Sequence, residues 1–180
     1  MKTVQITTDA YDFLAARARP FASFAETLDE FLAQASEKAE DSGSDVLKYD
    51  NPRNLPSVTH TVLKEFKADG AYGGYVSWNH ALEHLIELSA EKGVARDDIK
   101  SMLKLKFVDG QKSDNGYRYV PAAGISFQGV DARRALQAAV ALAAHSDIDI
   151  LYRFVWADSD KAAHPGRWGE LHLQSEKLSQ

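Results

Sequence analysis

Cysteine is absent from this chain of 180 residues. Without a thiol, the protein can form no disulfide, no thiolate nucleophile and no zinc site with Cys ligands. No apolar run approaches the roughly 18 residues that a membrane-spanning helix needs, and the first residues lack the long apolar stretch of a signal peptide. We therefore expect a cytoplasmic protein.

The familiar catalytic motifs are also missing. The sequence has no phosphate-binding loop, dinucleotide fingerprint or nucleophile elbow. The segment His80–His84 fits the pattern H-x-x-E-H, in which two histidines can bind zinc and Glu83 can act as a base. On a helix these side chains would share a face with Glu87 and Glu91, so we interpret the pattern as the solvated side of an amphipathic helix. We expect no metal, no cofactor and no enzymatic activity.

Acidic residues outnumber basic ones, and the formal net charge is -5. Such a balance argues against a general nucleic-acid binder, because Lys and Arg make most phosphate contacts. The distribution of charge changes that conclusion. Residues 1–45 hold four basic and nine acidic residues and account for the whole -5, whereas residues 100–134 hold seven basic and three acidic ones. We expect a polyanion to bind in this basic stretch.

The N-terminal residues predict a small oligomerisation segment. Residues 2–7 alternate apolar and polar side chains, as a half-buried strand does. One short helix should end at Pro20, and another should begin at Ser23, where Glu26 completes a capping box. A strand and two helices cannot bury a core alone, so we expect a ribbon-helix-helix dimer over residues 1–38. Its predicted dimer contacts are Val4, Ile6, Phe24, Leu28 and Phe31.

This segment resembles a known family. The features that carry the likeness are the opening Met1-Lys2-Thr3, Tyr11 in the first helix, and Ser23, Ala25 and Leu28 in the second. They resemble the amino-terminal oligomerisation segment of the SeqA family, bacterial proteins that sequester newly replicated origins by binding hemimethylated GATC sites. The resemblance implies that the segment oligomerises. In ribbon-helix-helix repressors the polar face of the strand reads the major groove, so Thr3, Gln5 and Thr7 remain open as base contacts.

The rest of the chain predicts a linker and one further domain. Residues 39–57 lose the apolar period and gather Ser, Gly, Asp, Asn and Pro, which is typical of a linker. Residues 58–180 predict a helix-rich α+β domain with a short antiparallel sheet. The expected helices cover residues 58–68, 77–93, 95–103 and 135–144, and the expected strands cover residues 102–108, 116–120, 125–128, 149–156 and 170–173. The chain as a whole is therefore expected to be α+β.

The candidate DNA-binding site lies between residues 102 and 145. Lys104 and Lys106 alternate with apolar residues and should share one face of a strand. Arg133 and Arg134 fall in the first turn of a helix, where backbone amides favour a phosphate. A strand, a loop and a basic helix start can hold cationic and amide donors against a polyanion. The predicted DNA contacts are Lys104, Lys106, Arg118, Ser126, Gln128, Gly129, Arg133 and Arg134.

A second resemblance covers residues 75–150. The order of helix, basic strand, Val120-Pro121, polar loop and basic helix start is similar to the DNA-binding domain of the SeqA family. In that family two arginines flank one residue on a strand, and asparagines in a later loop read the methylated base pair. Lys104 and Lys106 match the arginine positions, and Ser126–Gly129 fall where the asparagines would be. The resemblance implies binding to double-stranded DNA, methylated or otherwise modified, although this loop contains no asparagine.

These observations lead to two alternative functions. The first is a DNA-binding regulator of replication or transcription, associated with the nucleoid, that acts as a dimer or higher oligomer and senses DNA sequence or modification. The alternative is a dimeric ribbon-helix-helix adaptor or antitoxin-like regulator whose C-terminal domain binds a protein or a small ligand. In that case the lysines and arginines only solvate the surface. Residues 151–180 have no assigned role in either.

Overall fold

The computed structural model describes residues 46–72 and 77–178. The chain divides into two units, residues 1–45 and residues 46–180. The predicted ribbon-helix-helix segment belongs to the first unit and lies outside the described residues, together with its expected dimer contacts and the Thr3, Gln5 and Thr7 face. The following description concerns the second unit alone.

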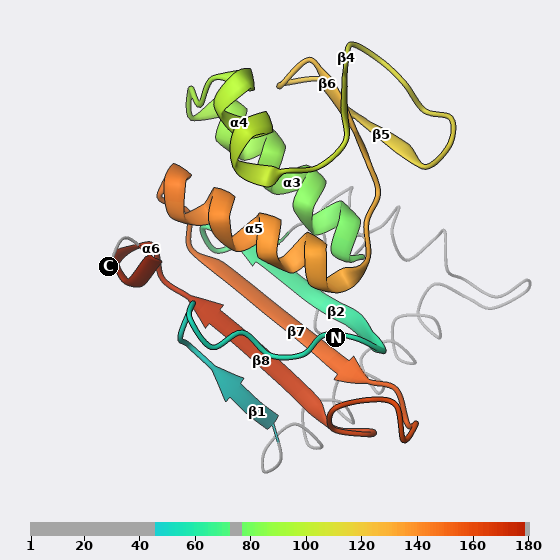
Figure 1. The fold of residues 1–180 in the computed structure, drawn as a ribbon. Helices are drawn as coiled ribbons and strands as arrows, with labels where there is room; N and C mark the ends of the chain where they lie inside the picture. Colours follow the sequence, from blue (N-terminus) through green and yellow to red (C-terminus); the bar gives the residue numbers. More distant parts are fainter. Residues whose placement is uncertain (1–45, 73–76, 179–180) are drawn as a thin grey trace, which may run out of the picture. The chain divides into compact units, whose positions relative to one another are not determined.

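The described part of the chain is α+β, as the patterns of its segments predicted (Figure 1). Its strands are β1 (Val46–Tyr49), β2 (Thr61–Ala68), β3 (Ala71–Tyr72), β4 (Phe107–Asp109), β5 (Tyr117–Val120), β6 (Ile125–Gln128), β7 (Ile150–Trp156) and β8 (Trp168–Leu173). Its helices are α3 (Trp78–Glu91), α4 (Arg96–Leu103), α5 (Ala132–Ser146) and the single turn α6 (Ser175–Leu178).

Two sheets organise this unit. The larger one has five strands in the order β1-β8-β7-β2-β3, in which β1 runs parallel to β8 and the other neighbours are antiparallel. The smaller one has three antiparallel strands in the order β4-β6-β5. Helices α3 and α5 pack against each other on one face of the larger sheet, and the smaller sheet lies beside α3 and α4 (Figure 1).

The core lies between these helices and the larger sheet. Ser77 caps α3 by accepting a hydrogen bond from the backbone N–H of His80, and Asp131 caps α5 by accepting one from Arg134. The capping residues fix where each amphipathic helix begins, and the apolar period then decides which face is buried. The largest fully buried side chains are Trp156, Tyr152, Phe66, Phe127, Phe154, Leu82, Leu85, Ile86, Ile99, Ile125, Leu136 and Leu142.

The predicted helix over residues 58–68 is wrong, because this stretch contains strand β2. Leu63 and Phe66 are both buried, and their spacing of three suggested a helix. In the sheet this spacing arises from a register shift between Leu63 and Glu65, where a β-bulge adds one residue and reverses the alternation. Val62, beside the buried Leu63, is 53% exposed. The bulge thus produced a spacing of buried residues like that of a helix.

The predicted strand over residues 102–108 begins too early. Helix α4 continues to Leu103, whose side chain is buried, and Lys104 ends the helix in a left-handed conformation with φ of 50°. Strand β4 therefore covers only Phe107–Asp109. Nor do β4 and β5 form a hairpin, because β6 pairs between them. The alternating apolar residues and lysines that suggested one strand belong partly to the end of α4 and partly to the segment that leads into β4.

Part of the predicted linker belongs to the folded unit. Residues 46–49 form the edge strand β1, which pairs with β8. The chain then crosses to the start of β2, and the indole N–H of Trp156 donates a 2.8 Å hydrogen bond to the carbonyl of Ser57. Val58 is buried in the core. Turn-forming residues here build a fixed crossover rather than a spacer.

The remaining predictions in this unit are confirmed within a few residues: helices α3, α4 and α5 and strands β5, β6, β7 and β8. Their signals were local and mutually consistent, as in α3, where Ser77 begins the helix and Gly93 follows its end with φ of 90°. In the part of the chain that the structure describes, no helix has both the length and the apolar character needed to cross a membrane.

Candidate nucleic-acid interface

A short loop connects β6 to α5 and fixes where this helix begins. The Asn79 side chain on α3 makes two hydrogen bonds to Val130, donating to its carbonyl and accepting from its N–H, each at 2.9 Å. One residue earlier, the N–H of Gly129 donates to the carbonyl of Gly116 at 2.9 Å. Helix α3 and the residue before β5 therefore both hold the loop, so the start of α5 keeps a defined position beside the small sheet.

The first turn of α5 carries two exposed arginines. Neither Arg133 nor Arg134 forms an ion pair with another described residue. Both are at the positive end of the helix dipole, where cations are unfavourable and an anion is stabilising. The Asp131 carboxylate already accepts the N–H of Arg134 at 3.0 Å. A bound anion would therefore be held mainly by the two guanidinium groups.

Lys106 and Gln128 lie on one face of the small sheet. The N–H of Gln128 donates to the carbonyl of Lys106 at 2.9 Å, and Gln128 pairs with Tyr117 on the other neighbouring strand. Lys112 reaches the same face, because its ammonium lies 4.5 Å from the centre of the Tyr117 ring. The amide nitrogen of Gln128 donates to the Asn115 carbonyl at 3.2 Å. Lys112 was not among the predicted contacts, since nothing in the local sequence showed that the 110–116 loop folds back.

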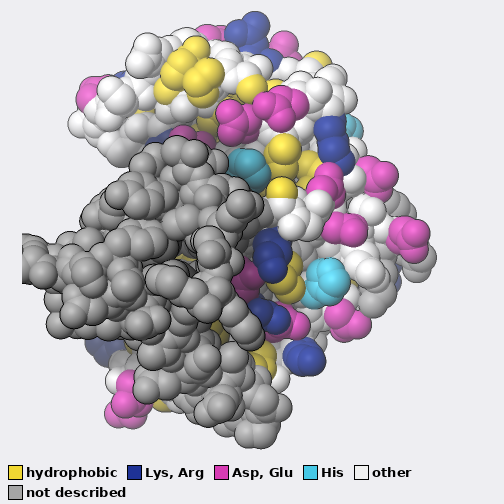
Figure 2. Space-filling model, turned by 180° about the vertical axis from the view of Figure 1, so that it is seen from behind, with side chains coloured by type: hydrophobic (Ala, Val, Ile, Leu, Met, Phe, Trp, Pro, Cys, Tyr) yellow, Lys and Arg dark blue, Asp and Glu magenta, His cyan; other side chains and the backbone are white. Residues whose placement is uncertain are grey.

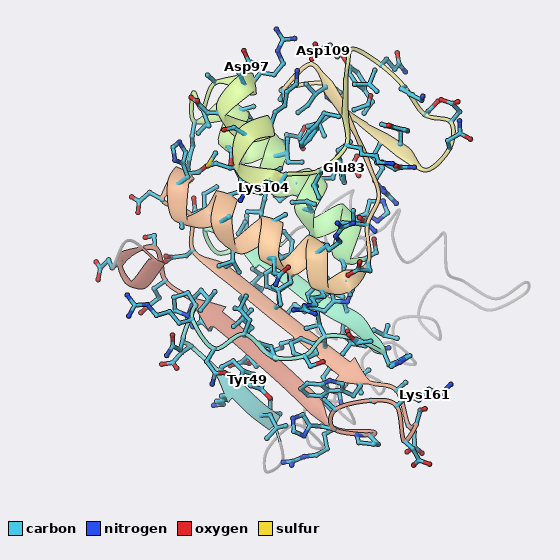
Figure 3. The ribbon with its side chains drawn as sticks, viewed as in Figure 1. Tyr49, Glu83, Asp97, Lys104, Asp109 and Lys161 are labelled. Atoms are coloured by element: carbon cyan, nitrogen blue, oxygen red, sulfur yellow. The ribbon has the colours of Figure 1, made fainter. Side chains whose placement is uncertain are left out.

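Arg118 is directed elsewhere. It pairs with Phe127, which is buried, so it lies on the opposite face of the small sheet from Gln128. Its guanidinium contacts the carboxylate of Glu83 on α3 at 2.9 Å, and both side chains are about 30% exposed. Glu83 is labelled in Figure 3. Arg118 therefore ties β5 to α3 and is not brought together with the other predicted contacts.

Ser126 is fully buried. Its hydroxyl accepts the N–H of Lys112 at 2.8 Å and donates to the carbonyl of Gly110 at 2.7 Å. Both bonds hold the 110–116 loop against β6. A hydroxyl with these two partners and no solvent exposure anchors the loop from beneath, and it does not present a hydrogen-bonding group at the surface.

Lys104 lies apart from Lys106, although only one residue separates them. It is the exposed residue that ends α4, and it makes no ion pair with a described residue (Figure 3). Lys106 follows after the chain has left the helix and is about to enter β4. The expected arrangement of both lysines on one strand face is therefore wrong. Both lysines are exposed on the short segment that connects α4 to β4.

Other cations of this region have acidic partners. Lys100 donates a hydrogen bond to Asp109 and so holds the pKa of that carboxyl below its ordinary value. Arg96 lies 3.9 Å from the same carboxylate, and Lys112 lies 3.9 Å from Asp114. Figure 2 shows the same intermingling of acidic and basic side chains on the described part of one face. Within residues 96–134, the basic residues that form no ion pair with another described residue are therefore Lys104, Lys106, Arg133 and Arg134.

The H-x-x-E-H pattern does not assemble a metal site. His80 Nδ1 lies 2.8 Å from the hydroxyl of Ser77, Glu83 pairs with Arg118, and the edge of His84 packs at the ring of a buried phenylalanine. No cluster of three or more His, Cys, Asp or Glu side chains suited to a metal ion occurs among residues 46–72 and 77–178. The pattern marks the half-buried side of α3.

Comparisons with known proteins found no match: no family model, no curated protein and no solved structure corresponds to this chain.

Proposed function

We propose that residues 46–180 form a module that binds double-stranded DNA. The observation that carries the proposal is the set of exposed cations without an ion partner among described residues around the β6–α5 loop. These cations are Lys106, Arg133 and Arg134; Lys104, at the end of α4, is also exposed without such a partner but lies apart from Lys106. Unpaired cations on a fixed backbone suit phosphate contacts, because no intramolecular ion pair must be broken when DNA binds.

Within this site the residues would divide their roles. Arg133 and Arg134 position the protein on the phosphate backbone, where a phosphate also offsets their unfavourable place at the start of α5. Lys106 and Lys112 add contacts from the small sheet. The carboxamide of Gln128 lies on the same face of the small sheet as Lys106, and an amide can pair with the edge of an adenine in the major groove. Gln128 is therefore the residue proposed to carry discrimination between sites.

Modest charge predicts modest affinity for a single module. Residues 46–180 contain 17 basic and 17 acidic residues, as 21 - 4 and 26 - 9, so their formal charge is zero. A handful of phosphate contacts then gives weak binding that salt abolishes easily. Linking modules raises the overall affinity without new contacts. We propose that the N-terminal ribbon-helix-helix segment, residues 1–38, supplies this link, so that the protein acts as a SeqA-like oligomeric regulator of replication or transcription.

The direct test is the salt dependence of DNA binding by the full chain. Replacing both Arg133 and Arg134 by alanine should weaken binding to every duplex and reduce the slope of log affinity against log salt by about 0.9 for each phosphate that the protein no longer neutralises. The matched control replaces Arg96 and Lys161, which removes the same charge elsewhere. Both variants should keep the wild-type circular dichroism spectrum, because the replaced side chains are exposed.

The outcome separates DNA binding from the adaptor alternative. A protein that shows no affinity for any duplex at low salt, where phosphate contacts are strongest, is not a DNA-binding module. If the affinity of the two double variants falls equally, attraction depends on net charge and the β6–α5 site is excluded. A selection from random duplexes with and without methylation then identifies the sequence and the modification recognised.

A further inference from the structure

The five-stranded sheet has a second face, turned away from α3 and α5. Strand alternation places Tyr152, Phe154 and Trp156 of β7 in the core, so the intervening residues of this strand point to the other side. Strand pairing then defines rows of side chains that run across the sheet on this outer face. One row is entirely apolar and consists of Val46, Trp168, Val155 and Val62, which are neighbours on β1, β8, β7 and β2.

The next row on the outer face is charged with alternating sign. Its members, in the same strand order, are Lys48, Glu170, Arg153 and Glu65. The guanidinium of Arg153 contacts Glu170 at 2.7 Å and Glu65 at 3.1 Å. These ion pairs fix the Arg153 side chain between its two acidic neighbours. The face therefore presents an apolar row beside an ordered row of positive, negative, positive and negative charge.

We propose that a second copy of this chain packs on the outer face, with a two-fold axis parallel to the strands and between β8 and β7. This operation reverses the order of the strands but keeps each row opposite itself. Lys48 then faces the Glu65 position of the second copy, and Glu170 faces its Arg153. The apolar row meets the apolar row, so that Val46 faces the other copy's residue 62. Both rows are self-complementary.

Symmetry decides between the possible arrangements. A two-fold axis across the strands would place Lys48 opposite Lys48 and Arg153 opposite Arg153, which is unfavourable for like charges. Val62, at one end of the apolar row, is 53% exposed, the largest exposure among the described large apolar residues. The other three members of the row are partly exposed, and a partly exposed apolar row beside paired charges is the pattern of a contact surface with a polar border. The alternating charges determine how the second copy is oriented on that surface.

The size of the face indicates how strong the contact can be. Four strands spaced about 4.8 Å apart and about 20 Å long offer roughly 400 Å² of projected area per copy. A standard interface buries about 800 Å² on each side. The outer face is therefore too small for a tight dimer by itself. It fits a second contact between copies that the N-terminal segment of the proposed function already holds together, where the effective concentration is high, and in this respect it rests on that function.

Thiol cross-linking of the full chain tests this arrangement, since the protein has no native cysteine. Val46→Cys chains are mixed with Val62→Cys chains and treated with a bismaleimide that spans roughly the 10 Å between packed sheets. The mixture should give cross-linked dimers. Val62→Cys alone should give several-fold fewer, because two copies of residue 62 would lie about three strand spacings, roughly 14 Å, apart sideways. Ala141→Cys, at an exposed position of α5, is the control and should give none.

Each other result overturns the proposal. Equal cross-linking of Val62→Cys with itself would mean a different symmetry or random collision. No cross-link in the mixture, with both thiols reacting freely with a monofunctional maleimide, would mean that the face is open. No cross-link together with slow reaction at residue 62 would mean that something other than a second copy covers it. Because the readout contains no DNA, its failure is independent of the proposed DNA-binding function.

Discussion

Gly169 on β8 lies directly against the ring of Phe154, its partner on β7. A Cβ atom at residue 169 would be 2.6 Å from two atoms of that ring and 2.9 Å from Trp156. The missing side chain leaves room for these two aromatic rings, whose centres are 4.9 Å apart in an edge-to-face arrangement. The packing of β7 against β8 thus depends on the absence of a side chain at one position.

Replacing Gly169 by alanine should therefore destabilise the protein. Both rings belong to fully buried residues, so the extra methyl group can be accommodated only by moving the core. Overpacking of this kind costs about 1–3 kcal/mol. Urea unfolding followed by tryptophan fluorescence measures the change. The control is His172→Ala, an exposed position on the same strand, which should stay within about 0.5 kcal/mol of wild type. Equal stability of both variants would contradict the inferred packing.

A second prediction concerns the hydroxyl of Tyr152. This side chain is fully buried between Phe66 and Trp78, and its oxygen has no hydrogen-bond partner among the described residues. A buried hydroxyl without a partner costs about 1–3 kcal/mol of desolvation. Tyr152→Phe removes the hydroxyl and keeps the ring. We expect the free energy of unfolding to stay equal or to rise by about 1 kcal/mol, which urea titration at pH 7 measures. A decrease of more than about 1 kcal/mol would mean that the hydroxyl has a favourable interaction.

The same variant should change the alkaline limit of stability. Burial raises the pKa of Tyr152 well above its ordinary value of 10.0. The unfolded chain then releases this proton first, so the contribution is complete below about pH 10 and is lost as the pH rises further. Tyr152→Phe should therefore lose less stability between pH 9 and pH 11 than the wild type. Parallel curves for the two proteins would show that this tyrosine ionises equally in both states.

The described fold was predictable where the signals were local and agreed with one another. Helix α3 carries its capping serine, its apolar stripe and its terminal glycine within 17 residues, and the structure follows all three. Strand β2 was mistaken for a helix because the bulge that separates Leu63 from Glu65 depends on pairing with β7, which lies about 90 residues later in the chain. Single-sequence periodicity does not contain that pairing.

In the candidate site, too, local properties were predictable and those that depend on distant contacts were not. Exposure of Arg133 and Arg134 followed from their place at a helix start, a local property. The burial of Ser126 and the Arg118 contact with Glu83 depend on how a loop folds over β6 and how the small sheet meets α3. The basic and polar residues of the sequence therefore indicated which segment could form the site, but not which face of the small sheet each side chain lies on. Lys112 was missed for the same reason.

A third prediction uses the charged row of the outer sheet face. Burial of Glu65 raises its pKa, but hydrogen bonds and attraction from Lys67 and Arg153 outweigh this effect and leave the pKa below its ordinary value. The contribution of this carboxylate to the free energy of unfolding is complete above its pKa in the unfolded chain. It is lost as the pH falls through its lower pKa in the folded protein. In the Arg153→Gln variant, the free energy of unfolding that is lost at acid pH should be smaller by at most about 0.5 kcal/mol, because both partners are partly exposed. Unfolding at pH 3 to 6 measures it, with Lys161→Gln as the control.

The last prediction separates the cations of the small sheet by their partners. Arg118→Gln and Lys112→Gln each remove one positive charge from neighbouring strands or loops. Arg118 already contacts Glu83, so its replacement should leave the affinity for DNA and its salt slope unchanged and should cost up to about 1 kcal/mol of stability.

Lys112 lies on the face that carries Lys106 and Gln128, and its nearest carboxylate is 3.9 Å away. Its replacement should lower the salt slope by about 0.9 and weaken binding to all duplexes alike. Filter binding at several salt concentrations and urea unfolding give both quantities for each variant. The opposite pattern, with Arg118 affecting the slope and Lys112 silent, would place DNA on the α3 side of the small sheet and would exclude Gln128 as the residue that reads a base.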